Sequence, residues 1–202
     1  EEVFNRLVAP LKRAGKPYVV LSEYNLRFCD KYWVVENLAL EFLNAYRYLK
    51  EKGMRKLLVI GLNLTPENPR VNVLPLVMKP DCCEFLENPR SDTASARARM
   101  KEYLDTATIF CLTDLQAVGA MDALLEYGIR IPEDVNLMGC DNITDGLNAP
   151  VPLTTFQFSG RGVGRTALEV VLRAINGDYP DGVMITKRCR IVERDSVRTI
   201  KR

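Results

Sequence analysis

Polar side chains follow several apolar runs of the sequence. Asp141 and Asn142 come directly after VNLMGC. Thr113 and Asp114 come directly after TIFCL, and Asn63 stands two residues beyond KLLVIG. A carboxylate can accept hydrogen bonds from two hydroxyls at once, and an amide can both donate and accept. This set of groups is typical of a site for a neutral ligand that carries several hydroxyls.

Most of these residues also have a purely structural interpretation. Asp114 directly precedes a predicted helix, so N-capping is the favoured interpretation of its carboxylate. Asn142 and Asp145 are typical of a turn. Asp141 ends an apolar run and starts no evident helix, so a solvated loop residue and a ligand contact remain open alternatives.

Aromatic residues could complete such a site, because a ring can cover the apolar face of a sugar. Candidates are Tyr24, which follows Glu23 after the run YVVLS, together with Trp33 and Phe158. Phosphate binding is not indicated. The chain has no P-loop motif, and the glycines of GRGVG precede a helix but follow no buried strand of the dinucleotide-binding kind.

The absence of histidine from all 202 residues excludes a Ser-His or Cys-His dyad and a histidine metal site within this chain. The six cysteines form no C-x-x-C pair, and Cys111 and Cys140 lie in apolar runs where core positions are expected. We therefore expect no enzymatic activity, no metal and no cofactor. Unpaired cysteines suit a reducing cytoplasm, which is the expected location.

The charge pattern gives little indication of a partner. The net charge of +2 is too small to indicate nucleic-acid binding by itself. No apolar run approaches the ~20 residues that span a bilayer, so no membrane contact is expected. The locally basic stretch KRCRIVERDSVRTIKR is interpreted as a solvated edge strand with a frayed terminus.

Apolar runs alternate with helical patterns along the chain. Continuously apolar runs fit strands that are buried on both faces of a parallel sheet, although Pro75 limits the third run to an edge or interrupted strand. The alternation predicts an α/β fold with right-handed crossovers, in which ligands bind beyond the carboxyl ends of the strands. The predicted strands are residues 18–22, 56–61, 71–78, 108–112 and 135–140, and the predicted helices are residues 36–53, 91–104 (capped by Ser91 or Asp92), 114–128 and 164–177.

Several motifs between residues 108 and 197 occur together in a known family. They are TDLQAVGA in a helix, GIRIPEDV before a strand, GCDN, PLTT, the helix pattern G-x-x-A and the ending IVERDSV. This region resembles the effector-binding region of the lactose-repressor-type (LacI/GalR) transcriptional regulators. GKPYVVLSEYN and the segment ENLALEFLNAYRYLKEKGMRKLLVIG resemble the preceding region of that family more loosely.

The resemblance implies a periplasmic-binding-protein-like α/β fold with two similar lobes, each with a mainly parallel sheet flanked by helices. Residues 1–53 plus 158–185 would form an incomplete N-terminal lobe, and residues 54–157 plus 186–202 the C-terminal lobe. Such regulators hold a sugar or nucleoside-like effector between the lobes. They bind operator DNA as dimers through a helix-turn-helix domain that is not present in this chain, so a homodimer and operator DNA are the implied partners.

The resemblance also assigns ligand-binding roles to individual residues. Asp141 matches the effector-binding aspartate, Thr113 a polar ligand contact and Glu36 an acidic ligand position. Phe158 occupies a crossover position beside the ligand, and Arg70 is the candidate for a ligand-binding arginine. Asp114, from its place after a strand, completes the predicted site.

The chain departs from the family pattern at several points. Met54 stands where histidine is usual, and Phe158 stands where glutamine is common. The helix that normally begins near the ligand-binding arginine is missing between VIGLNLTPENPR and VNVLPLVM. Either segments have been omitted from the chain or the pocket has degenerated, and we favour omission because uncovered sheet edges and apolar faces would otherwise remain.

Two other functions remain alternatives at this point. A periplasmic sugar-binding protein of a transport system would share the fold, but unpaired cysteines and the IVERDSV ending argue against it. An enzyme could use Asp114 and Asp141 as acid and base, yet the chain offers no recognisable nucleophile. We therefore predict the effector-sensing and dimerisation region of a transcriptional regulator.

Overall fold

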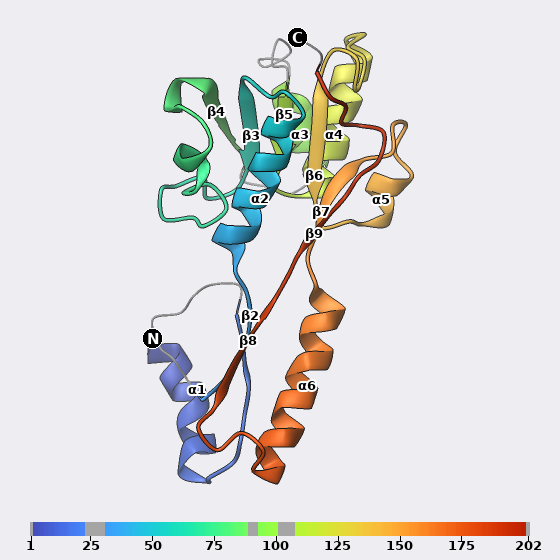
Figure 1. Ribbon diagram of the computed structural model, residues 1–202. Helices are drawn as coiled ribbons and strands as arrows, with labels where there is room; N and C mark the ends of the chain where they lie inside the picture. Colours follow the sequence, from blue (N-terminus) through green and yellow to red (C-terminus); the bar gives the residue numbers. More distant parts are fainter. Residues whose placement is uncertain (1, 23–30, 89–92, 101–107, 201–202) are drawn as a thin grey trace. The chain divides into compact units, whose positions relative to one another are not determined.

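The computed structural model describes residues 2–22, 31–88, 93–100 and 108–200 (Figure 1). The predicted ligand-edge residues Glu23 and Tyr24 and the predicted caps Ser91 and Asp92 lie outside these residues. The chain forms two compact units, which are Glu1–Leu38 with Ser159–Arg188, and Ala39–Phe158 with Cys189–Arg202. The predicted N-terminal lobe instead extended to residue 53.

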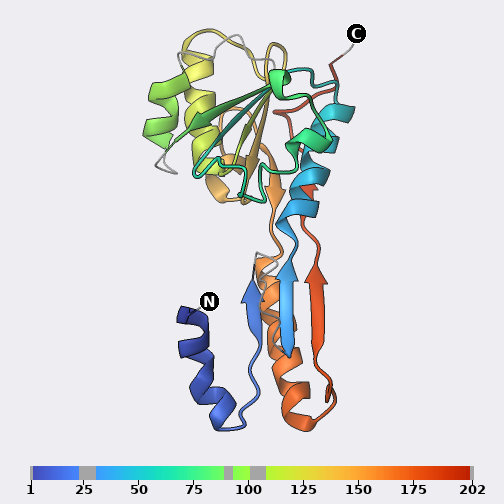
Figure 2. The same ribbon diagram turned by 90° about the vertical axis from the view of Figure 1, so that its left-hand side faces the viewer.

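The first unit is a three-stranded parallel sheet with a helix on each face (Figure 2). Its elements are α1 (Glu2–Arg13), β1 (Val20–Ser22), β2 (Tyr32–Glu36), α6 (Gly160–Asn176) and β8 (Val183–Lys187), with strand order β1-β2-β8. Because side chains alternate along β2, Val34 packs against Val170 of α6, whereas Trp33 joins Val20 and is covered by Phe4 of α1. One face of β2 thus packs against α6 and the other face against α1.

The second unit is a six-stranded sheet in the order β4-β3-β5-β6-β7-β9, parallel except for the antiparallel pair β7–β9. Its strands are β3 (Leu57–Gly61), β4 (Cys83–Glu87), β5 (Thr108–Cys111), β6 (Asn136–Cys140), β7 (Thr154–Gln157) and β9 (Arg190–Val192). Its helices are α2 (Leu38–Glu51, all but its first residue), α3 (Thr93–Arg99), α4 (Asp114–Glu126) and α5 (Thr144–Leu147), with the 3-10 turns η1 (Leu74–Leu76) and η2 (Pro80–Cys82).

Helices cover both faces of this sheet (Figures 1 and 2). On one face, Ile109 and Cys111 pack against small residues of α4. On the other face, the ring of Phe42 in α2 lies 5.8 Å from that of Phe110 and 5.2 Å from that of Phe156. These aromatic contacts explain why α2 belongs to the second unit rather than to the first.

Several strands lie where apolar runs of the sequence predicted them. The runs at 56–61, 108–112 and 135–140 form β3, β5 and β6, which confirms these predictions. The predicted strand at 71–78 is wrong, because this segment forms turns and η1. Pro75 sits within η1 and offers no N–H for a strand ladder. Val71, Val73, Leu74 and Val77 are buried in this coil, whereas Leu76 is exposed.

The mainly parallel α/β organisation in two units confirms the predicted fold class. No helix among the described residues combines the length and the apolar character needed to cross a membrane. Because β3, β5 and β6 are parallel, their carboxyl ends meet at one edge of the second sheet, and this edge carries most of the predicted site.

Candidate functional site

The carboxyl end of β6 turns sharply at two residues with unusual backbone conformations. Asp141 has φ 121° and Asn142 has φ 59°, a region that side chains other than glycine seldom adopt. The side chain of Asp141 is exposed, and that of Asn142 is half-buried. The turn therefore directs the predicted effector-binding carboxylate outward from the edge of the sheet.

Three consecutive backbone amides of this turn are held by hydrogen bonds. The N–H of Asp141 donates to the carbonyl of Phe156 at 2.8 Å, and that of Asn142 donates to the hydroxyl oxygen of Thr155 at 3.3 Å. The N–H of Ile143 donates to Oδ2 of Asp114 at 2.8 Å. Neighbouring elements, rather than local preference, thus fix the backbone of the turn.

Asp114 lies inside the unit and not at the cap of α4. Thr113 is the N-cap residue, since its hydroxyl accepts from the N–H of Gln116 at 3.3 Å, so the predicted N-cap role of Asp114 is wrong by one position. The Asp114 side chain is fully buried, and its Oδ1 accepts from the Thr155 hydroxyl at 2.6 Å. Burial raises the pKa of this carboxyl above its ordinary value, although its hydrogen bonds act in the opposite direction.

Arg194 contacts the same turn from the segment after β9. Its Nη2 donates to Oδ1 of Asn142 at 2.5 Å, and its Nη1 donates to the carbonyl of Leu153 at 2.6 Å. No ligand-site role was predicted for this arginine, which lies in the stretch KRCRIVERDSVRTIKR that was predicted to be a solvated edge strand. Its position in the family ending IVERDSV was the one signal that could have identified it.

Arg70 and Phe158 lie together beside this edge. The guanidinium carbon of Arg70 is 5.5 Å from the ring centroid of Phe158 and 5.6 Å from that of Phe42, within the range of cation–π attraction. The carbonyl of Arg70 accepts from the Tyr46 hydroxyl at 2.6 Å. Both predicted residues therefore rest on the aromatic layer under α2, with the side chains of Arg70 and Phe158 half-buried.

The charges of Asp141 and Arg70 both affect the pKa of Cys140, the last residue of β6. Burial raises the pKa of its thiol, the Asp141 carboxylate raises it further, and the Arg70 guanidinium lowers it. The charges of Arg70 and Asp141 therefore both act on the last residue of β6. A negative group, a positive group and an aromatic ring are brought to one edge of the sheet.

Glu36 belongs to the first unit, where it is the last residue of β2. Its side chain is 7% exposed, and its Oε1 accepts from the N–H of Ser159 at 2.5 Å. Ser159 is the N-cap residue of α6, so the carboxylate lies at the positive end of that helix. The predicted ligand contact of Glu36 stays a prediction.

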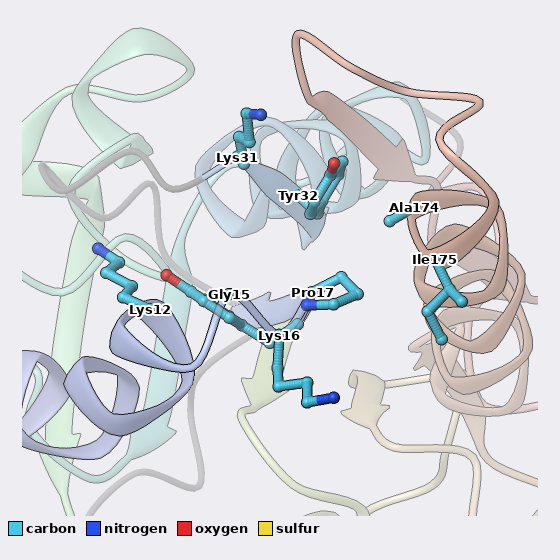
Figure 3. A pocket seen from close by; sticks show the side chains of 9 residues that line it. Lys12, Gly15, Lys16, Pro17, Lys31, Tyr32, Ala174 and Ile175 are labelled. Atoms are coloured by element: carbon cyan, nitrogen blue, oxygen red, sulfur yellow. The ribbon is translucent and has the colours of Figure 1, made fainter.

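Two cavities whose linings include none of the predicted site residues lie in different units of the described structure. The larger, about 620 Å³, lies in the first unit near the start of β2 and is lined by Lys12, Lys16 and Lys31 together with Tyr32 and Ile175 (Figure 3). The three amines point in different directions, so they do not converge on one anion. The smaller, about 260 Å³, is an apolar hollow between η1 and β4.

No group of three or more His, Cys, Asp or Glu side chains suited to a metal occurs among the described residues. The donor set at the β6 edge is instead suited to hydrogen bonding. Asp141 can accept from hydroxyls, Arg70 can donate, and Phe158 offers a ring face. This arrangement fits recognition of a small polar molecule.

Known proteins resemble this chain along most of its length. The family of the periplasmic binding protein-like domain matches residues 46–197. An HTH-type transcriptional repressor PurR of Vibrio vulnificus is 36% identical over 56% of this chain and 34% of its own length. The PurR repressor of Pasteurella multocida is 28% identical over 77% of this chain and 49% of its own length, so the chain spans at most about half of these relatives.

Solved structures show the same fold. A LacI family transcriptional regulator from Enterococcus faecalis with bound ribose superposes with a TM-score of 0.80 at 22% identity, covering 100% of this chain and 76% of that one. A LacI family regulator from Arthrobacter in complex with lactose superposes with a TM-score of 0.78 at 23% identity, covering 96% and 74%. The chain belongs to the periplasmic binding protein-like domain family, and the proteins that it resembles include LacI family transcriptional regulators.

Proposed function

We propose that this chain is the effector-sensing region of a sequence-specific transcriptional regulator. In this proposal it binds a small sugar or nucleoside-like molecule and thereby alters the affinity of the protein for operator DNA. The DNA would be bound by a domain outside this chain, the protein would act as a homodimer in the cytoplasm, and the chain would have no catalytic role.

The observation that carries the proposal is the outward turn at Asp141. Its exposed carboxylate stands on a backbone conformation that three amide hydrogen bonds maintain. Arg70 lies over the ring of Phe158, which contacts the ring of Phe156 beside the end of β6. A carboxylate that accepts hydroxyls, a guanidinium that donates and a ring that covers an apolar face together match the chemistry of a sugar.

The relatives support the regulatory part of the proposal. The PurR proteins are transcriptional repressors by name, and similar solved regulators contain ribose, lactose or cellobiose. A ligand that binds one conformation of the protein better than another shifts the balance between them. Coupling of that shift to DNA affinity is reciprocal, so operator DNA would also change the affinity for the ligand.

The direct test is calorimetry of Asp141→Ala, with Asp145→Ala as the matched control. Asp145 is an exposed carboxylate a few residues away in α5, so it controls for the loss of a negative charge. We expect wild type and Asp145→Ala to bind a sugar from a panel of ribose, lactose, cellobiose and purine nucleosides. Asp141→Ala should lose at least about tenfold in affinity, because a hydrogen bond to a charged group contributes about 1.5–3 kcal/mol.

Equal affinity in all three proteins would remove Asp141 from the site. The regulatory part is tested separately, with the full-length protein and a labelled operator fragment. A sugar that binds tightly but leaves DNA affinity unchanged would contradict a sensing role and would favour a protein that only binds sugar, such as a component of a transport system.

A further inference from the structure

The turn at Asp141–Ile143 is held from two sides by side chains that are distant in sequence. Thr155 comes from β7, and Asp114 comes from the first turn of α4. The hydrogen bond between these two side chains joins residues 41 positions apart, and the bond from the Ile143 amide to Asp114 joins residues 29 positions apart. Arg194, 52 residues beyond Asn142, contacts the turn from the segment after β9. No local sequence preference could supply this support.

The hydroxyl of Thr155 is the central link of this support. It donates to Oδ1 of Asp114 at 2.6 Å and accepts from the N–H of Asn142 at 3.3 Å. The other carboxylate oxygen of Asp114 accepts from the N–H of Ile143. Asp114 therefore acts on the turn in two ways, directly through Ile143 and indirectly by orienting the hydroxyl that holds Asn142.

The surrounding packing leaves the Asp114 carboxylate little freedom. A Cβ atom added at Gly139 of β6 would overlap Oδ1 of Asp114, so the carboxylate lies directly against the backbone of that strand. The side chains of Asp114 and Thr155 are both fully buried. A residue so enclosed is fixed in place, and it can transfer that rigidity to the exposed turn.

We propose that Asp114, with Thr155 and Arg194, is a positioning residue that holds the positive-φ turn in the conformation presenting Asp141 to the ligand. Asp114 in this view acts through Asp141 and not by touching the ligand itself. The inference rests on the proposed function for the ligand, while the restraint of the turn can be measured without any ligand. Positive-φ conformations of non-glycine residues persist where the surrounding structure enforces them.

The test compares Thr155→Val with Thr155→Ser by amide hydrogen exchange of the ¹⁵N-labelled chain. Valine keeps the shape of threonine but lacks the hydroxyl, whereas serine keeps the hydroxyl and loses a methyl group. We expect exchange at Asn142 and Ile143 to accelerate about tenfold or more in the valine variant and to stay near wild type in the serine variant. Amides of β5, such as those of Ile109 and Phe110, should change little in either.

Thr108→Val is the matched control for the substitution itself. Thr108 is fully buried in β5, and its hydroxyl has no hydrogen-bond partner within the described structure. Its replacement should leave exchange at the turn unchanged. Exchange that rises equally across the whole sheet in Thr155→Val, or that stays unchanged at the turn, would overturn the positioning role, because the hydroxyl would then serve only general stability or nothing.

A second readout uses ribose, or whichever sugar of the panel binds wild type. Affinity should fall in Thr155→Val and Asp114→Asn and recover in Thr155→Ser. An affinity that is unaffected by a loosened turn would overturn the inference. If wild type binds no sugar, the proposed function fails on its own, and hydrogen exchange alone decides whether these residues restrain the turn.

Discussion

At the scale of single residues, Asp114 is an ionisable group that is buried and held by several hydrogen bonds. Its carboxyl is buried against Gly139 and faces the Thr155 hydroxyl and the Ile143 amide, while the charge of Arg194 also acts on it. Those partners lower its pKa, yet burial is the larger effect and raises the pKa above 3.8. Burial thus disfavours the charged form, and the hydrogen bonds of the carboxylate offset only part of this effect.

This balance predicts a pH dependence of stability. The native carboxyl takes up a proton at higher pH than the unfolded one, so the native state binds more protons just above pH 3.8. The stability that Asp114 contributes is therefore full below that pH and is lost as pH rises through the raised pKa. Urea unfolding of wild type and Asp114→Asn, from about pH 4 to about pH 8, should show the wild type losing stability relative to the variant.

The free energy of unfolding of Asp114→Asn should lack the decrease with rising pH that the Asp114 carboxyl causes in the wild type between about pH 4 and about pH 8. Other carboxyls, such as Asp134 with its pKa lowered by Arg130, titrate in both proteins and cancel in the difference. A difference between the two proteins that does not vary with pH would show that the native pKa of Asp114 is not raised.

At the scale of elements, β6 must pack closely against α4 so that the Asp114 carboxylate can contact the turn at Asp141–Ile143. Gly139 allows this approach, since an added Cβ would overlap Asp114 and would lie 2.7 Å from a methyl carbon of Leu153. Gly164 of α6 is the opposite case, because nothing lies within 4 Å of an added Cβ there. Glycine thus permits close packing of β6 at position 139, whereas at position 164 it only lowers the helix propensity of α6.

Gly139→Ala and Gly164→Ala should therefore change stability in opposite directions. We expect Gly139→Ala to lower the free energy of unfolding by about 1–3 kcal/mol through overpacking. Gly164→Ala should raise it by about 0.5–1 kcal/mol through better helix propensity. Denaturant midpoints measure both, and a harmless Gly139→Ala would mean that β6 and α4 can separate without loss.

Elements also show how far sequence reasoning could reach. Long apolar runs predicted β3, β5 and β6, because burial on both faces leaves a plain pattern. The strand β4 was missed, since at the sheet edge its residues are mostly exposed and its composition is mixed. Residues 71–78 were assigned a strand because apolarity alone does not distinguish a strand from a buried coil.

The candidate site was predictable in its residue types but not in its connections. The positions of Thr113, Asp114 and Asp141 after apolar runs placed them correctly at the carboxyl ends of β5 and β6. The bonds of Asp114 to Thr155 and of Arg194 to Asn142 join residues more than 40 positions apart. Only the tertiary arrangement determines such pairs, so the support of the turn became visible with the structure.

At the scale of the whole molecule, the two units have cores of unequal size. Among the described residues, the second unit has a large apolar cluster beneath α4, together with the aromatic layer under α2. The described part of the first unit has two small clusters, one on each face of a three-stranded sheet. Smaller cores bury a lower fraction of surface, so we expect the first unit to be the less stable.

Denaturation followed by two signals should reveal this difference. Trp33 is the single tryptophan of the chain and is buried in the first unit, whereas helix ellipticity arises from both units. The fluorescence midpoint should therefore fall at lower urea than the midpoint of the second phase of ellipticity. Coincident transitions would show instead that the units unfold as one cooperative body.

The location of Trp33 has a further consequence for studying the ligand. The indole lies in the unit that does not contain the Asp141 turn, and it packs with Val20, Val35 and Phe4 of that unit. A shift of the emission spectrum on adding sugar would therefore report a change in the surroundings of the indole within the first unit. The chain thus carries an intrinsic fluorescent reporter in its smaller unit.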